Sequence, residues 1–122
     1  PDKPGLDAQP FIADPGNGYD LERVLVVEGE IKSMCTYLTA DDPTLQVLGI
    51  PGKSFFPKIA NKLQNHTVFI CLDPGAETEM RNAAKLVNGR IITYPMKIDD
   101  AINSGALDKK GIQRLMKSAI NK

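Results

Sequence analysis

Two groups of acidic side chains follow apolar stretches in this chain, at positions that suit the binding of a metal ion. Glu28 and Glu30 follow the apolar run 25–27, and Asp73 and Glu77 follow a second apolar run. Apolar runs without alternation are typical of strands buried on both faces of a parallel sheet, and ligands bind beyond the carboxyl ends of such strands. If the two strands are neighbours, the carboxylates converge and repel one another unless a cation compensates them. Hard oxygen ligands favour Mg²⁺ or Mn²⁺, ions that support phosphoryl or nucleotidyl transfer.

The same carboxylates also have a purely structural explanation. Acidic residues are favourable in the first turn of a helix, where they complement the helix dipole. Gly29 would allow the sharp turn from strand to helix. Either acidic group alone favours this structural role, whereas two acidic strand ends together favour a metal site.

Strands and helices alternate along the chain, and this alternation determines where the carboxylates would lie. We expect four strands, at residues 23–27, 45–48, 67–72 and 90–94. We expect helices after them, at about 30–39, 55–63, 77–87 and 99–104, and a last amphipathic helix at about 109–120. In the first helix, apolar residues recur every three or four positions and are expected to face the core: Ile31, Met34, Cys35 and Leu38.

Such alternation requires parallel strands joined by right-handed crossovers. The predicted fold is therefore an α/β three-layer helix–sheet–helix sandwich with a four-stranded parallel sheet. Residues 1–20 are rich in proline and glycine and are predicted to be a lead-in segment or linker, in which Phe11 and Ile12 could form a short edge strand. Residues 21–122 are predicted to form one domain that ends in a helix.

The composition of the chain is that of a water-soluble globular domain. Its 122 residues are 42% hydrophobic and 25% charged, enough for one domain with a core. Lys and Arg together number 15, as do Asp and Glu, so net charge argues neither for nor against nucleic acid. No apolar run approaches the ~20 residues that span a bilayer. Cys35 and Cys71 are expected to be small buried residues in a reducing compartment, which predicts a cytoplasmic protein without a membrane partner.

Both acidic segments resemble the Toprim domain, which is shared by bacterial-type primases, topoisomerases, some nucleases and recombination proteins. The resemblance rests on Val-Val-Glu-Gly-Glu at 26–30 and Ile-Cys-Leu-Asp-Pro-Gly-Ala-Glu at 70–77, and it covers about residues 21–105. It implies a sheet of order 2-1-3-4, which places the first and third strands side by side. It also implies that Glu28 is the invariant glutamate of the family and Asp73 the first aspartate of its Asp-x-Asp pair.

The chain departs from the Toprim pattern at two positions. Gly75 stands where the family has its second aspartate, and Lys32 stands where primase members usually have an aspartate. Glu77 and Glu30 could partly replace these carboxylates. The resemblance therefore implies a reduced set of ligands, with one metal ion or none.

The resemblance also implies roles for individual residues. Glu28 would be a metal ligand or general base at a 3′-hydroxyl, and Asp73 would be the principal metal ligand. Residues 97–102 resemble the Asp-Pro-Asp-type motif of primases, so Asp99 or Asp100 would be a further ligand at the rim. The structural alternative for these two aspartates is a simple helix N-cap.

We expect a Toprim-like module of a DNA primase or primase-helicase, from a phage or mobile element, that supports metal-dependent nucleotidyl transfer in DNA replication. Its partners would be a single-stranded DNA template, nucleotides and other domains of a larger primase or helicase. Because an acidic edge cannot itself hold DNA, basic residues near it are expected to do so: Lys32, Lys53, Lys58 and Lys62.

Two alternatives remain open from the sequence. The first is a non-catalytic Toprim-like module for DNA docking or protein interaction, which Gly75 and Lys32 favour. The second is a receiver-like phosphoacceptor domain, in which Asp73 would be the acceptor and Lys97 its partner; the count of four strands and the glycine between the first two glutamates argue against it. The last helix is also basic, which usually indicates a solvated face and sometimes a nucleic-acid surface.

Overall fold

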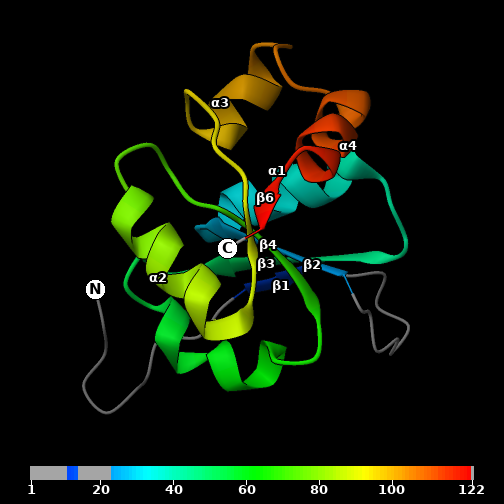
Figure 1. Cartoon of the computed structure of the whole chain (residues 1–122). Coiled ribbons are helices and arrows are strands. Elements are labelled where there is room, and N and C mark those ends of the chain that lie inside the picture. The colour runs from blue at the N-terminus through cyan, green and yellow to red at the C-terminus, as the bar shows by residue number, and fades with distance from the viewer. Residues whose placement is uncertain (1–10, 14–22, 122) are drawn as a thin grey trace, which may run out of the picture.

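One mixed sheet forms the centre of the protein (Figure 1). The computed structural model describes residues 11–13 and 23–121, so most of the predicted lead-in segment lies outside the described residues. The described strands are β1 (Phe11–Ala13), β2 (Arg23–Glu28), β3 (Leu45–Ile50), β4 (Thr67–Cys71), β5 (Arg90–Ile91) and β6 (Ile120–Asn121).

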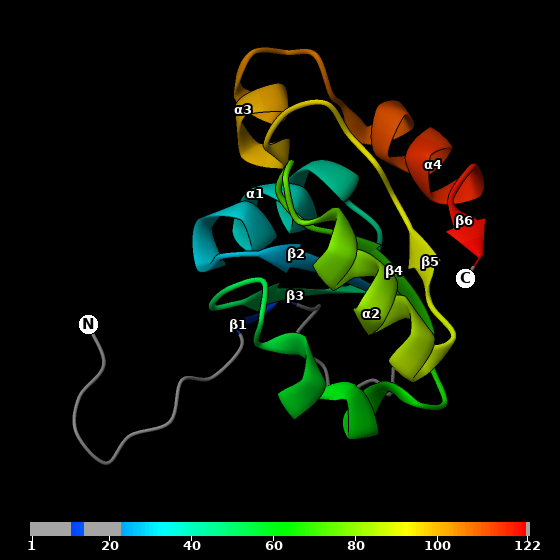
Figure 2. The same cartoon turned by 60° about the vertical axis from the view of Figure 1, so that its left-hand side comes forward.

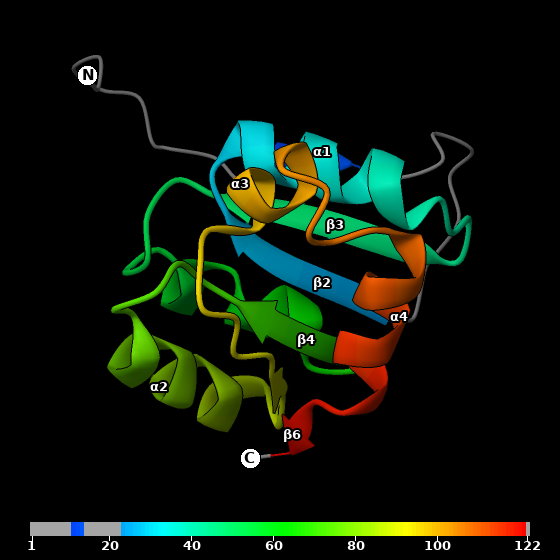
Figure 3. The same ribbon diagram turned by 90° about the horizontal axis from the view of Figure 1, so that it is seen from above.

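The strand order confirms the predicted topology. Within the sheet order β1-β3-β2-β4-β5-β6, the inner strands β3, β2, β4 and β5 are parallel and correspond to the predicted order 2-1-3-4. Figure 3 shows β3, β2 and β4 side by side. The edge strands β1 and β6 run antiparallel to their neighbours, and β6 was not predicted.

Helical segments cover both faces of the sheet, as the predicted three-layer sandwich requires (Figure 2). The helices are α1 (Glu30–Ala40), α2 (Glu77–Val87), α3 (Ile98–Asn103) and α4 (Lys109–Lys117), and the short 3-10 helices are η1 (Phe56–Lys58) and η2 (Ala60–Leu63). Val24 and Val26 pack with η1, η2 and α2, whereas Leu25 and Val27 pack with α1, α3 and α4. The first strand is therefore buried on both faces, as its apolar run predicted.

Helix α1 buries a different face from the one predicted. Ile31 and Leu38, expected in the core, are 69% and 72% exposed, and Met34 is exposed as well. The buried residues of this helix include Ser33 and Thr36, both with no exposed surface. Their hydroxyl groups donate to the carbonyl oxygens of Glu30 and Lys32 within the helix, at 2.6 and 2.7 Å, so burial leaves neither without a partner.

The small buried residues allow α1 to lie close to the sheet beside Gly49. A Cβ atom at position 49 would lie 2.3 Å from the carbonyl oxygen of Gly29 and 2.7 Å from Ser33 Oγ. Only glycine fits at position 49 under so close an approach, and a residue larger than Ser33 would clash with this part of β3. Steric fit therefore overrides the apolar periodicity in this helix.

Other predicted elements also differ from the structure in type or in length. The segment 55–63 forms two 3-10 helices instead of one α-helix, in a stretch where Pro57 lacks a backbone donor. Strand β5 ends at Ile91, and α4 ends at Lys117 before the chain turns into β6. Among the described residues, no helix is long and apolar enough to cross a membrane.

Candidate functional site

The carboxyl ends of β2 and β4 lie next to each other and bring Glu28 and Asp73 together. Val27 pairs with Cys71 in the parallel ladder, so the residues that follow both strands emerge at one edge of the sheet. The backbone N–H of Asp73 donates to Glu28 Oε1 at 3.3 Å. The expected convergence of two acidic strand ends therefore exists for these two residues.

A lysine side chain lies at the same edge. Lys32 Nζ is 3.5 Å from Asp73 Oδ2, and the two side chains are only 16% and 20% exposed. Gly29 makes this placement possible, because its φ of 98° turns the chain sharply between β2 and α1. The site thus contains a positive charge from the protein itself beside the two carboxylates.

The four other predicted acidic ligands do not join Glu28 and Asp73 in a larger cluster. Glu30 and Asp100 are exposed, and Asp99 accepts a hydrogen bond from the backbone N–H of Asp100. Glu77 is exposed at the start of α2, and backbone hydrogen bonds, its own N–H first and then that of Gly75, hold its pKa below the usual range. Within residues 11–13 and 23–121, no group of three or more acidic, histidine or cysteine side chains is placed to hold a metal ion.

At this edge, the described residues therefore offer a metal ion two carboxylates at most, those of Glu28 and Asp73. Mg²⁺ is often held by one or two carboxylates and substrate phosphates, and Glu28 and Asp73 would supply such a pair. However, an ion between them would meet the ammonium group of Lys32 at 3.5 Å from Asp73. Two cations cannot share this position without strong repulsion, so the pair fits a single ion only if Lys32 moves away.

The four lysines predicted to hold nucleic acid do not share a common site, and three of them contact different partners. Lys32 is engaged with Asp73, and Lys53 lies 3.9 Å from Glu79. Lys58 lies over the ring of Phe55, 5.4 Å from its centroid, and Lys62 is exposed on η2. Their role in binding stays a prediction.

The receiver-like alternative gains no support from the geometry. A phosphoacceptor aspartate of that kind would use Lys97 as its partner. In the described residues, the ion pair of Asp73 is with Lys32, and Lys97 lies at the N-cap position of α3.

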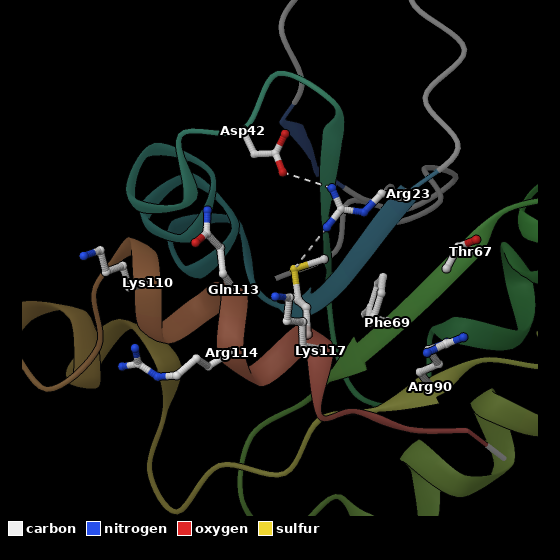
Figure 4. Close-up of a pocket in the computed structure, with 10 residues that line it drawn as sticks. Arg23, Asp42, Thr67, Phe69, Arg90, Lys110, Gln113, Arg114 and Lys117 are labelled. Carbon is white, nitrogen blue, oxygen red and sulfur yellow. Dashed lines mark hydrogen bonds and ion pairs between the residues drawn. The ribbon is translucent and has the colours of Figure 1, made fainter.

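Sequence analysis did not identify a second charged region, at the opposite end of the strands. An open pocket of about 870 Å³ lies between α4 and the first residues of β2, β4 and β5 (Figure 4). Its basic lining residues come from all of these elements except β4: Arg23, Arg90, Lys110, Arg114 and Lys117. The basic face of the last helix was visible in the sequence, but its alignment with Arg23 and Arg90 depends on the strand order.

Comparison with known proteins supports the fold. No protein-family model matches the sequence, and no curated protein matches it. A solved structure of a small TOPRIM domain protein from Bacillus stearothermophilus superposes with a TM-score of 0.59 at 12% identity, over 85% of this chain and 92% of the other. The chain therefore has a Toprim-like α/β fold.

Proposed function

We propose that this chain is a Toprim-like module that docks nucleic acid within a larger protein of the primase or primase-helicase type, without transferring nucleotides itself. The resemblance of its two acidic segments to primase Toprim domains connects the module with nucleic acid. The observation that carries the proposal is the ion pair of Lys32 with Asp73 at the sheet edge.

The ion pair gives a physical reason for the loss of catalysis. The Glu28–Asp73 pair needs a positive charge nearby, because two close carboxylates repel each other. Lys32 supplies this charge from within the protein, so the site is compensated without a divalent ion. An ammonium group cannot coordinate a phosphate oxygen and a hydroxyl in the way that a Lewis-acidic metal does.

Titration of Mn²⁺ into two variants tests this proposal. Lys32→Asp replaces the ammonium with a carboxylate and should raise Mn²⁺ affinity by about tenfold or more, as changes of metal-site partners do. The control, Lys85→Asp, makes the same charge change at an exposed lysine in the last turn of α2 and should leave affinity nearly unchanged. Tight Mn²⁺ binding by the wild type would contradict the proposal.

A second candidate function is metal-dependent nucleotidyl transfer, and the proximity of Glu28 and Asp73 favours it. These two residues would hold a single Mg²⁺ or Mn²⁺, which would polarise a phosphate group. Lys32 would then have to leave Asp73 when substrate binds. Stabilisation of the wild type by Mn²⁺, by about 2.7 kcal/mol at a hundredfold excess over the dissociation constant, would favour this candidate.

A further inference from the structure

The pocket beside α4 is separate from the Glu28–Asp73 pair. It lies at the amino-terminal ends of the parallel strands, where β2 begins with Arg23, whereas Glu28 ends the same strand. Five residues of strand, at about 3.3 Å each, place these two ends about 16 Å apart. We call this pocket the α4 groove.

The α4 groove carries a strong excess of positive charge. Its lining includes five basic side chains and one carboxylate, Asp42. Only one of the cations is neutralised, because Arg23 Nη1 lies 3.0 Å from Asp42 Oδ2. In the part of the chain that the structure describes, the other four have no carboxylate within ion-pair distance: Arg90, Lys110, Arg114 and Lys117.

These four cations lack a described carboxylate partner in a chain with 15 basic and 15 acidic residues. Like charges in one groove repel one another and lower stability unless an anion binds between them. We propose that the α4 groove binds the phosphodiester backbone of nucleic acid.

The spacing of the cations suits successive phosphates. Lys110, Arg114 and Lys117 follow one another along α4, and at 1.5 Å per residue they extend over about 10 Å. Successive phosphates of one strand are at least about 3.4 Å apart, the rise along a duplex axis, so the row is long enough to face more than one of them. Arg90 stands on the other wall, at the start of β5 (Figure 4).

The wall formed by β2 is held in place by defined contacts. Arg23 donates to Asp42 and Thr44, at 3.0 and 3.1 Å, and its second terminal nitrogen lies 3.9 Å from Met116 Sδ on α4. The contact with Met116 connects the strand with the helix across the groove. The cations on α4 are thus presented from a fixed position relative to the sheet.

The groove lacks the features of a membrane or protein interface. The large exposed apolar side chains of the described residues all lie outside it: Ile31, Met34, Leu38, Leu86 and Met96. A membrane-bound helix needs an apolar face to insert, and protein interfaces rely on aromatic or aliphatic anchors. Phe69 lines the groove but is only 6% exposed, so stacking of bases is not available there. Recognition would therefore be of the backbone and independent of sequence.

The salt dependence of oligonucleotide binding tests this inference, which rests on the proposed docking of nucleic acid but not on the state of the Glu28–Asp73 pair. The probe is a fluorescein-labelled oligothymidylate, titrated by anisotropy in chelator over a series of salt concentrations. Arg90→Gln with Lys117→Gln removes one cation from each wall. Because each phosphate contact contributes about 0.7 to the slope of log affinity against log salt, this double variant should lower the slope by about 1.4.

The matched control removes an arginine and a lysine outside the groove, Arg81→Gln with Lys85→Gln on α2, where both residues are exposed. This control should keep the wild-type slope. Equal slopes for the groove variant and the wild type would rule out binding of nucleic acid at the α4 groove, while binding elsewhere on the protein would remain possible. Absence of any oligonucleotide binding by the wild type would instead overturn both the groove and the proposed function. Displacement of the probe by inorganic triphosphate at far lower concentrations than by unlabelled oligonucleotide would identify a small-anion site and overturn the assignment to nucleic acid.

Discussion

Lys32 reaches Asp73 because of where it lies on α1. Side chains of an α-helix tilt toward its amino terminus, so a lysine in the first turn extends back over the strand end that precedes the helix. Both members of the Lys32–Asp73 pair are more than three-quarters buried, which reduces solvent screening. This ion pair is therefore the main electrostatic feature of the sheet edge that holds Glu28 and Asp73.

Asp42 makes the free energy of unfolding depend on pH in the acidic range. Burial alone would raise its pKa, but hydrogen bonds from the hydroxyl and backbone N–H of Thr44, together with Arg23, outweigh burial and lower the pKa. A carboxyl group with a lowered pKa stabilises the fold above its unfolded pKa of about 3.9, and this contribution is lost as pH falls through the folded value. Asp42→Asn should lower the free energy of unfolding by about 1 kcal/mol at neutral pH and flatten its decline in acid.

Urea unfolding between neutral and acidic pH measures this effect. The neighbouring Asp41→Asn is the control, because Asp41 is exposed and its left-handed backbone suits asparagine. An equal loss of stability in both variants would show that the contacts of Asp42 are not responsible.

Cys71 should be inert in the folded protein. Burial, and then the nearby charge of Asp73, raise the pKa of its thiol to about 12. Since the thiolate is the reactive form, iodoacetamide at about pH 8 should modify Cys71 only when the protein unfolds. Mass spectrometry after labelling in native buffer and in denaturant measures this. Rapid modification in native buffer would show that the end of β4 opens readily.

The residues of the acidic edge were only partly predictable. Glu28 and Asp73 could be paired from the sequence, because each directly follows an apolar strand and the strand order followed from the Toprim resemblance. The contact between Lys32 and Asp73 could not, because it depends on the angle at which α1 leaves the turn at Gly29.

Helix α1 shows why periodicity failed for one element. Its apolar residues recur at helical spacing, yet the helix buries Ser33 and Thr36 because Gly49 draws it close to β3. Helix α2 follows the rule, since its buried residues recur at helical spacing: Met80, Ala83, Ala84 and Val87. Periodicity therefore predicts a helix but not always the face that it buries, since close approach of two backbones selects small residues whatever their polarity.

Substitutions in α1 should distinguish the two orientations. Leu38→Lys should change the free energy of unfolding by no more than about 0.5 kcal/mol, as surface substitutions usually do. Thr36→Leu should lower it by about 1–3 kcal/mol, because the buried face has no room for a larger side chain. Chemical denaturation measures both. A larger loss from Leu38→Lys than from Thr36→Leu would mean that α1 buries its apolar face.

Among the described residues, the acidic pair and the basic groove lie at opposite ends of the parallel strands, which a net charge of zero does not reveal. The Glu28–Asp73 pair lies at the carboxyl ends of the strands, and the cations of the α4 groove lie at the opposite ends. The order of the four parallel strands was predictable from alternation and resemblance. The α4 groove was not, because Arg23, Arg90 and Lys117 are far apart in sequence and meet only through the folded sheet.

A double-mutant cycle of Lys32 with Asp73 tests whether the lysine replaces a metal ion as the partner of this aspartate. The cycle compares the wild type, Lys32→Met, Asp73→Asn and the double variant by chemical denaturation, in chelator and again with millimolar Mn²⁺. We predict a coupling energy of about 1 kcal/mol in chelator, above the ~0.3–0.5 kcal/mol within which independent substitutions add, and no stabilisation of the wild type by Mn²⁺. Two results together would contradict this role of Lys32 and identify Asp73 as a metal ligand. The effects of the two substitutions would be additive in chelator, and Mn²⁺ would stabilise the wild type but not Asp73→Asn.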